Sequence, residues 1–125
     1  MSNEQPAVRV DIDEHHTTED GPVFVATVTG RITVGETERF SELVAPLTQH
    51  PPAAVVVDCA GLDFVSSAGI GEIIKLEHAT RALHAKFFLI NVQQQVLSTL
   101  VQSKLDEMIP MYDSLEQALL HTDPS

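Results

Sequence analysis

The first two segments of the chain alternate apolar and polar residues in the manner of β-strands. VRVDID, from Val8 to Asp13, alternates strictly, and PVFVATVTG, which ends at Gly30, is rich in β-branched and aromatic residues. Both patterns are typical of half-buried strands. EHHTTEDG, which lies between them, has the composition of a turn, so the pattern predicts a β-hairpin.

The middle of the chain changes from a helical pattern to a strand pattern and back. Apolar residues recur at helical spacing after Thr33, and Glu36, three residues later, completes a capping-box signature. Pro51 and Pro52 cannot continue this helix. AAVVVDC and AKFFLINV are continuous apolar runs, which favour strands covered on both faces. A second helical pattern separates the two runs, and this order predicts parallel strands joined by a right-handed crossover.

Two further helical patterns complete the chain. The first of them rests on Val96, Leu97, Leu100 and Val101. The second is DSLEQALL, with Asp113 and Glu116 as its capping box. We therefore expect a single α/β domain over residues 8–120, with a mixed sheet of about four strands packed with about four helices. Residues 1–7 and 121–125 are expected to be flexible ends.

Charge and cysteine content narrow the class of protein. The chain of 125 residues has 7 Lys and Arg against 18 Asp and Glu, a net charge of -11, which repels the phosphates of nucleic acids and of anionic lipids. Cys59 is the only cysteine and cannot form an internal disulfide. No run of 18 apolar residues occurs. We expect a cytoplasmic protein that neither binds nucleic acid nor inserts into a membrane, and we find no metal-binding or catalytic set of residues.

The candidate chemistry lies in GLDFVSSAGIGEIIKLEHA, residues 61–79, where a strand pattern changes to a helical one. Ser66 and Ser67 are followed, at the capping-box spacing, by Gly69 and Ile70 rather than by an acid. The predicted helix would therefore begin without a carboxylate near its N–H groups. Since a helix amino terminus attracts anions, a phosphoryl group on one of these serines would suit its dipole.

Other readings of the same residues stay open. One serine can act only as an N-cap, with Gly69 and Gly71 providing close packing. A phosphate-binding loop is disfavoured, because the Gly-Lys-Ser/Thr ending is missing. A hydrolase nucleophile elbow around Ser67 is half present, since Gly69 follows at the right spacing but Val65 stands where the first glycine is needed.

A longer stretch of sequence carries a family resemblance. VVVDCAGLDFVSSAGIGEIIKLEHA, read with VTGRITVGE upstream and FFLINVQQQVLSTLVQSKLDEMIPMYDSLEQAL downstream, resembles the STAS domain. This family contains bacterial anti-sigma factor antagonists and the cytosolic domains of sulfate transporters. The resemblance extends from about Val8 to Leu120.

The resemblance implies a protein-binding switch rather than an enzyme, with no cofactor. Ser67 matches the serine that an anti-sigma factor with serine kinase activity phosphorylates, and Ser66 is the second choice. Partners would be that kinase and a phosphatase, and a homodimer is possible. The implied partner-binding residues are Thr33, Ser66, Ser67, Ala68, Gly69, Ile70 and Gly71.

Two positions differ from the family pattern and favour a second hypothesis. The family often has Asp where this chain has Ser66, and again where it has Thr33. A chain without these acids fits a STAS subunit that is not phosphorylated and forms part of a signalling scaffold or a membrane-transporter complex. A third hypothesis is an acyl-transferring or ester-cleaving enzyme that uses Ser67 as its nucleophile.

Overall fold

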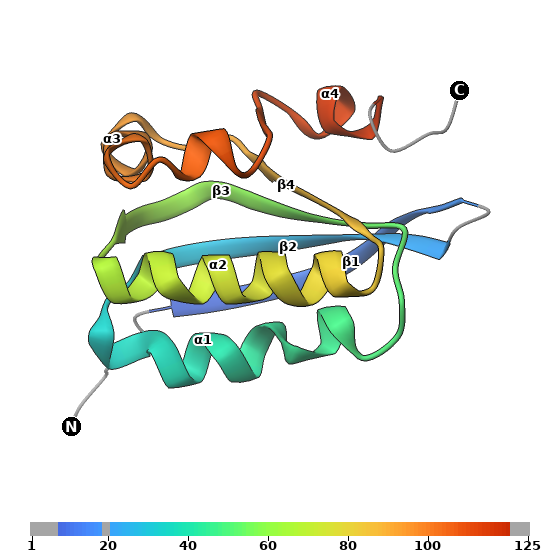
Figure 1. Ribbon diagram of the computed structural model, residues 1–125, viewed down its shortest axis with the longest axis horizontal. Coiled ribbons are helices and arrows are strands. Elements are labelled where there is room, and N and C mark those ends of the chain that lie inside the picture. Colours follow the sequence, from blue (N-terminus) through green and yellow to red (C-terminus); the bar gives the residue numbers. More distant parts are fainter. Residues whose placement is uncertain (1–7, 19–20, 121–125) are drawn as a thin grey trace.

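The protein is built on one mixed β-sheet (Figure 1). The computed structural model describes residues 8–18 and 21–120. Five strands follow one another across the sheet in chain order, and only the first pair is antiparallel. The strands are β1 (Val8–Thr18), β2 (Gly21–Ile32), β3 (Ala54–Val65), β4 (Lys86–Ile90) and β5 (Met111–Tyr112). The predicted α/β class and the parallel crossover are confirmed.

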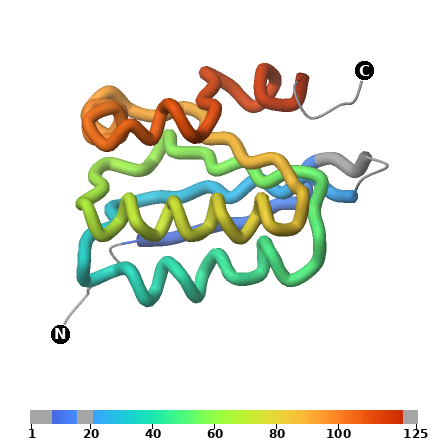
Figure 2. Tube along the Cα trace, in the orientation of Figure 1, coloured from blue at the N-terminus to red at the C-terminus, as the bar shows by residue number. Residues whose placement is uncertain are grey.

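Helices connect the parallel strands and cover the sheet. The α-helices are α1 (Thr37–Val44), α2 (Ser67–Ala82), α3 (Gln94–Gln102) and α4 (Leu115–Leu119). Short 3₁₀ turns add η1 (Val34–Glu36), η2 (Ala45–Thr48) and η3 (Leu105–Glu107). Figures 1 and 2 show α1 and α2 side by side below the sheet, with α3 and α4 above it. Among the helices of the described ranges, none has the length and apolar composition needed to cross a bilayer.

The apolar run of β3 is buried because helices cover both faces of the sheet. Val55 and Val57 belong to a large core cluster that also contains Phe40 of α1 and Leu76 of α2. Val56, which points the other way, belongs to a smaller cluster that contains Ala118 of α4. Successive residues of a strand point to opposite faces, so a strand between two layers needs an apolar residue at every position.

Three details of the structure differ from the prediction. The sheet has five strands rather than about four, because β5 is a strand of 2 residues and too short to show a pattern. The predicted turn is too long, because β1 continues to Thr18 with an irregularity in its pairing between Glu14 and His16. Residues 19 and 20 of that turn, and the predicted flexible ends at 1–7 and 121–125, lie outside the described residues.

The third correction concerns the start of α4, which is capped by Ser114 and not by Asp113. The Ser114 hydroxyl accepts a hydrogen bond from the Gln117 N–H at 3.2 Å, and the Gln117 carboxamide accepts one from the Asp113 N–H at 3.0 Å. The capping pattern is therefore displaced by one residue along the chain.

Cys59 is packed in the core, as its position after an apolar run indicates. Its side chain is buried in β3, and burial, with a smaller contribution from Asp58, raises the pKa of the thiol to about 12. The thiol is therefore protonated at neutral pH and chemically unreactive in the folded protein.

Removing the cap of α4 should destabilise the protein, whereas changing its neighbour should not. Ser114→Ala deletes the acceptor for the Gln117 N–H and is expected to lower the free energy of unfolding by about 1 kcal/mol. Asp113→Ala keeps the backbone N–H that Gln117 binds and should change it by less than about 0.5 kcal/mol. Urea unfolding of the two variants checks this, and equal losses would contradict the assignment of the cap.

Candidate functional site

The candidate site forms where β2 and β3 end side by side. Ile32, the last residue of β2, is paired with Val65, the last residue of β3. The next residue, Ser66, donates its backbone N–H to the Ile32 carbonyl at 2.9 Å, and α2 begins directly after it. The start of α2 is thus attached to the end of β2 and faces outward at the carboxyl end of the parallel strands.

Ser66 is the N-cap of α2 and its hydroxyl is committed to that role. The Ser66 Oγ accepts a hydrogen bond from the Gly69 N–H at 3.2 Å and donates one to the Ile32 carbonyl at 3.4 Å. Its backbone is extended, with φ -86° and ψ 176°, as is usual at this position. The Ser66 hydroxyl therefore has a structural role, which is to cap α2.

Ser67 differs from Ser66 in every one of these respects. It is the first residue of α2 and is exposed to solvent. Within the described part of the chain its hydroxyl makes no hydrogen bond. No acidic residue lies in the first turn of α2, so the helix amino terminus lacks the carboxylate that often occupies such a position. Of the two serines, only Ser67 presents a hydroxyl that is free to be modified.

The two glycines of the segment do different things. A Cβ atom on Gly69 would lie 2.4 Å from the Ile32 carbonyl oxygen and 2.9 Å from Val65 Cγ1, so no larger residue fits. A Cβ atom on Gly71 would meet nothing within 4 Å. The expectation that both glycines serve close packing is therefore confirmed for Gly69 and wrong for Gly71.

Thr33 lies beside this turn but is held in its own capping box. η1 packs against α2. Thr33 donates its backbone N–H to Glu36 Oε1 at 2.8 Å and its hydroxyl to the same oxygen, and it accepts from the Gly35 N–H at 3.3 Å. These hydrogen bonds from Thr33 hold the pKa of the Glu36 carboxyl below its ordinary value of 4.5. The predicted capping box is confirmed, and it directs the Glu36 carboxylate to Thr33.

The segments that meet here bring all the predicted partner-binding residues together. The four residues after Ser67 differ in burial. Gly69 and Ile70 are buried, whereas Ala68 and Gly71 are partly exposed. Val34 and Phe64, which the sequence did not single out, belong to the same segments and are 77% and 51% exposed. Two exposed apolar side chains therefore lie on the segments that form the candidate site.

The family of the chain follows from comparison of its sequence with family models. The model of the STAS domain matches residues 14–118. The chain belongs to the STAS domain family. No curated protein matches the sequence.

Solved structures show the same fold. An anti-sigma factor antagonist from Mycobacterium paratuberculosis has a TM-score of 0.80 at 18% identity, covering 95% of this chain and 97% of that one. The unphosphorylated form of the anti-sigma factor antagonist SpoIIAA has a TM-score of 0.69 at 16% identity, covering 92% and 100%. The murine anion transporter Slc26a9 has a TM-score of 0.71 at 20% identity, covering 80% of this chain and 17% of the transporter.

Polar side chains hold the start of α3 against the end of β3 in this STAS domain. Gln93 Nε2 donates to the Ala60 carbonyl at 2.7 Å and to Asp63 Oδ1 at 3.3 Å. Asn91 Nδ2 donates to Asp58 Oδ1 at 3.2 Å. These bonds tie the β4–α3 connection to the strand that leads into Ser66. Among the described residues, no group of three or more His, Cys, Asp or Glu side chains is placed to hold a metal ion.

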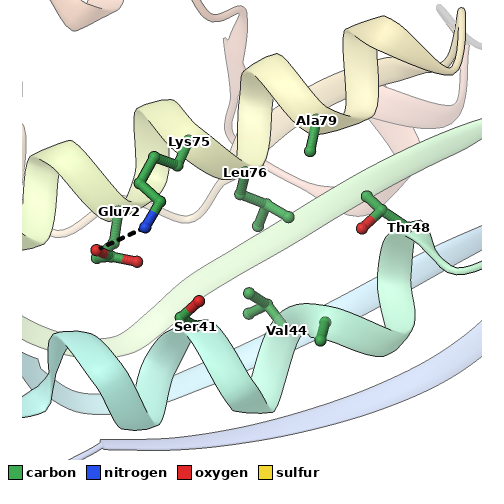
Figure 3. A pocket seen from close by; sticks show the side chains of 8 residues that line it. Ser41, Val44, Thr48, Glu72, Lys75, Leu76 and Ala79 are labelled. Atoms are coloured by element: carbon green, nitrogen blue, oxygen red, sulfur yellow. Dashed lines mark hydrogen bonds and ion pairs between the residues drawn. The ribbon is translucent and has the colours of Figure 1, made fainter.

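A shallow groove of about 230 Å³ runs between α1 and α2 beside the site (Figure 3). Val44 and Leu76 lie on its two sides, and Lys75 pairs with Glu72 at 3.4 Å. The groove is lined by Ser41, Val44, Ala45, Thr48, Glu72, Lys75, Leu76 and Ala79. Ser67 is not among these residues, so the groove does not bring a substrate to its hydroxyl.

The two glycines should respond in opposite directions to the same substitution. Gly69→Ala forces a Cβ atom against the Ile32 carbonyl and is expected to lower the free energy of unfolding by about 1–3 kcal/mol. Gly71→Ala adds a methyl group in open space and should raise it by about 0.5–1 kcal/mol, because alanine favours the helix. Urea unfolding measures both, and a destabilised Gly71→Ala variant would contradict the assignment.

The Glu36 carboxylate should make stability depend on pH. Because its pKa is lowered in the folded state, it stabilises the fold above its unfolded pKa, and this contribution is lost as the pH falls through the folded pKa. Between about pH 7 and pH 3 the wild type should therefore lose more stability than Glu36→Gln. Urea midpoints measured across this range test it. Glu42→Gln, which removes an exposed charge from α1, is the control for charge alone.

Proposed function

We propose that this STAS domain is an anti-sigma factor antagonist-like regulatory protein that binds an anti-sigma factor with serine kinase activity. The turn from Ser66 to Gly71, with Thr33 beside it, forms the contact, and phosphorylation of Ser67 breaks it. A phosphatase restores the unmodified protein. The observation that carries this proposal is the Ser67 hydroxyl, which is exposed and makes no hydrogen bond to any described residue, at a helix start with no acid in its first turn.

The physical effect of a phosphate at Ser67 follows from its surroundings. The group adds about -1.5 to -2 charges and accepts hydrogen bonds from the N–H groups at the start of α2. The fold tolerates it, because Ser66 and not Ser67 makes the capping bond to Gly69. A partner that packs on Val34 and Phe64 would instead have to desolvate that charge. Phosphorylation therefore weakens binding and leaves the domain folded.

Two features support a regulatory role over catalysis. In the described part of the chain, no histidine hydrogen-bonds Ser67, so the hydroxyl has no base to activate it as a nucleophile. The groove beside α2 does not contain Ser67. The family also supports the proposal, since similar folds include proteins described as anti-sigma factor antagonists. On this proposal the protein is cytoplasmic and needs no nucleic acid or cofactor.

A second function is favoured by Ser66 and Thr33, which stand where the family often has Asp. Both hydroxyls donate hydrogen bonds within the domain, that of Ser66 to the Ile32 carbonyl and that of Thr33 to the Glu36 carboxylate. A STAS subunit of a scaffold or transporter complex would need no modified serine, and a similar fold occurs within the Slc26a9 anion transporter. Co-purification of a large homogeneous assembly or a transporter ATPase would support this function over the switch.

The switch predicts that charge at position 67 abolishes partner binding without unfolding the domain. Ser67→Asp should keep the wild-type melting temperature, because an acid suits the first turn of a helix, and should lose the kinase-like ATPase in co-purification. Ser67→Ala should keep the partner. Ser98→Asp, which places the same charge on the exposed face of α3, is the matched control and should also keep it.

The modification itself is tested on protein taken from its own cells. Phosphopeptide mass spectrometry should place a phosphate on Ser67, and none on Ser66, whose hydroxyl is bonded to the Ile32 carbonyl. Ser66→Ala is expected to cost about 1 kcal/mol of stability through loss of the cap, while Ser67 is still phosphorylated. An unmodified Ser67, together with unchanged partner binding by Ser67→Asp, would rule the switch out.

A further inference from the structure

The first half of β4 lies at an open edge of the sheet. β4 pairs with β3 along its whole length, from Lys86 to Ile90. β5, its neighbour on the other side, pairs only with Leu89 and Ile90. Within the described residues, the segment from Lys86 to Phe88 therefore has a strand on one side only.

The backbone of Phe87 points out of this open edge. The Lys86 N–H donates to the Ala53 carbonyl, beside β3, at 3.1 Å, whereas the Leu89 N–H donates to the Pro110 carbonyl, beside β5, at 3.1 Å. Because successive peptide groups of a strand point to opposite sides, the N–H and C=O of Phe87 face the same way as those of Leu89. Pro110 has no N–H to donate to the Phe87 carbonyl, so the ladder stops there.

A pocket of about 310 Å³ lies against this edge. α2 contributes Glu77 and Arg81 to its lining, and Pro110 also lines it. Its other lining residues are Ala85, Lys86, Phe87 and Phe88. Glu77 is the only acid in the lining, and Arg81 Nη2 already pairs with it at 3.0 Å. The Arg81 side chain is 65% exposed, and a guanidinium has further N–H donors.

Cations outnumber acids in the lining of this pocket, whereas acids outnumber cations in the whole protein. From His78 to Leu105 the sequence contains no Asp or Glu, although the chain has 18 of them. Arg81 and Lys86, two of the 7 Lys and Arg residues, line this one pocket. An acidic ligand is therefore repelled less here than over most of the surface.

We propose that the open edge of β4 binds an extended acidic segment of a partner protein, which adds to the sheet as a short strand. The backbone of the segment pairs with the N–H and C=O of Phe87. Acidic side chains at neighbouring positions of the segment point to opposite faces of the sheet, one toward Arg81 on the face covered by α2 and the next toward Lys86, which shares its face with Phe88. Strand addition of this kind takes its affinity from main-chain hydrogen bonds and its specificity from side-chain contacts.

The same edge is unsuited to a second copy of itself. Pairing two β4 edges would place Lys86 near Lys86, and like charges in such pairs are unfavourable. An acidic strand meets no such repulsion. The edge is also remote from Ser67, since Ser67 and Arg81 lie near opposite ends of α2, about 20 Å apart along the helix axis. This site is therefore independent of the proposed phosphorylation switch.

A fluorescein-labelled five-residue peptide with valine at both ends and three adjacent acids, glutamate, aspartate and glutamate, is the probe, because adjacent acids reach both faces of the sheet. Its fluorescence anisotropy should rise on titration with the full-length protein, and amide NMR shifts should change at Phe87 and Leu89 and not at Ser67. A peptide with glutamine and asparagine in place of the acids should bind more weakly. N-methylation of the central residue should abolish binding, because it removes a main-chain donor while the charge is retained.

Protein variants test whether peptide binding depends on the cations at the β4 edge or on the net charge of the protein. Arg81→Gln and Lys86→Gln should each weaken binding by roughly two- to fivefold. Lys75→Gln, which removes an exposed cation elsewhere on α2, should not. Lys86→Gln leaves the Arg81–Glu77 pair intact, so it remains informative if Arg81→Gln fails to fold. The proposal is overturned by no binding at about 1 mM peptide, by equal binding of the neutral peptide, or by a concentration-dependent dimer that occupies the β4 edge.

Discussion

The Ile32 carbonyl oxygen is the point on which the functional end of this domain depends. It accepts the Ser66 N–H at 2.9 Å and the Ser66 hydroxyl at 3.4 Å, and Gly69 packs against it so closely that no Cβ atom fits. A buried carbonyl without partners is costly, so these contacts are strongly preferred over any other position of the helix. They set where α2 begins and which of its residues face solvent.

The two adjacent serines at this junction have different roles. The backbone N–H and hydroxyl of Ser66 join α2 to the end of β2, whereas Ser67 lies at the surface and its hydroxyl bonds to none of the described residues. The neighbouring capping box binds Glu36 to Thr33, and the first turn of α2 contains no acid of its own. A helix start that is hydrogen-bonded to β2 and has no acid in its first turn suits a phosphate that changes the surface a partner meets without changing the fold.

The two ends of the sheet have different interaction properties. At the carboxyl end of the parallel strands, the segments that meet at the start of α2 carry exposed Val34 and Phe64, and the helix start favours an anion. At the beginning of β4, an open edge lies next to Arg81 and Lys86 in a protein that is otherwise strongly acidic. α2 joins these two ends and packs into the core through Ile70, Ile73 and Leu76.

By itself, the sequence determined the α/β class, the hairpin, the crossover, the Thr33–Glu36 capping box and the strand-to-helix segment proposed as the site, because periodicity and capping are local properties of the chain. It did not determine β5, the cap at Ser114, or the exposure of Phe64, which depend on pairing and register between distant strands. Only the tertiary structure decided that Ser66 is the cap, Ser67 the free hydroxyl, and Gly69 but not Gly71 the required glycine. The reason is physical: each of these roles is set by distance to the end of β2, which is remote in sequence.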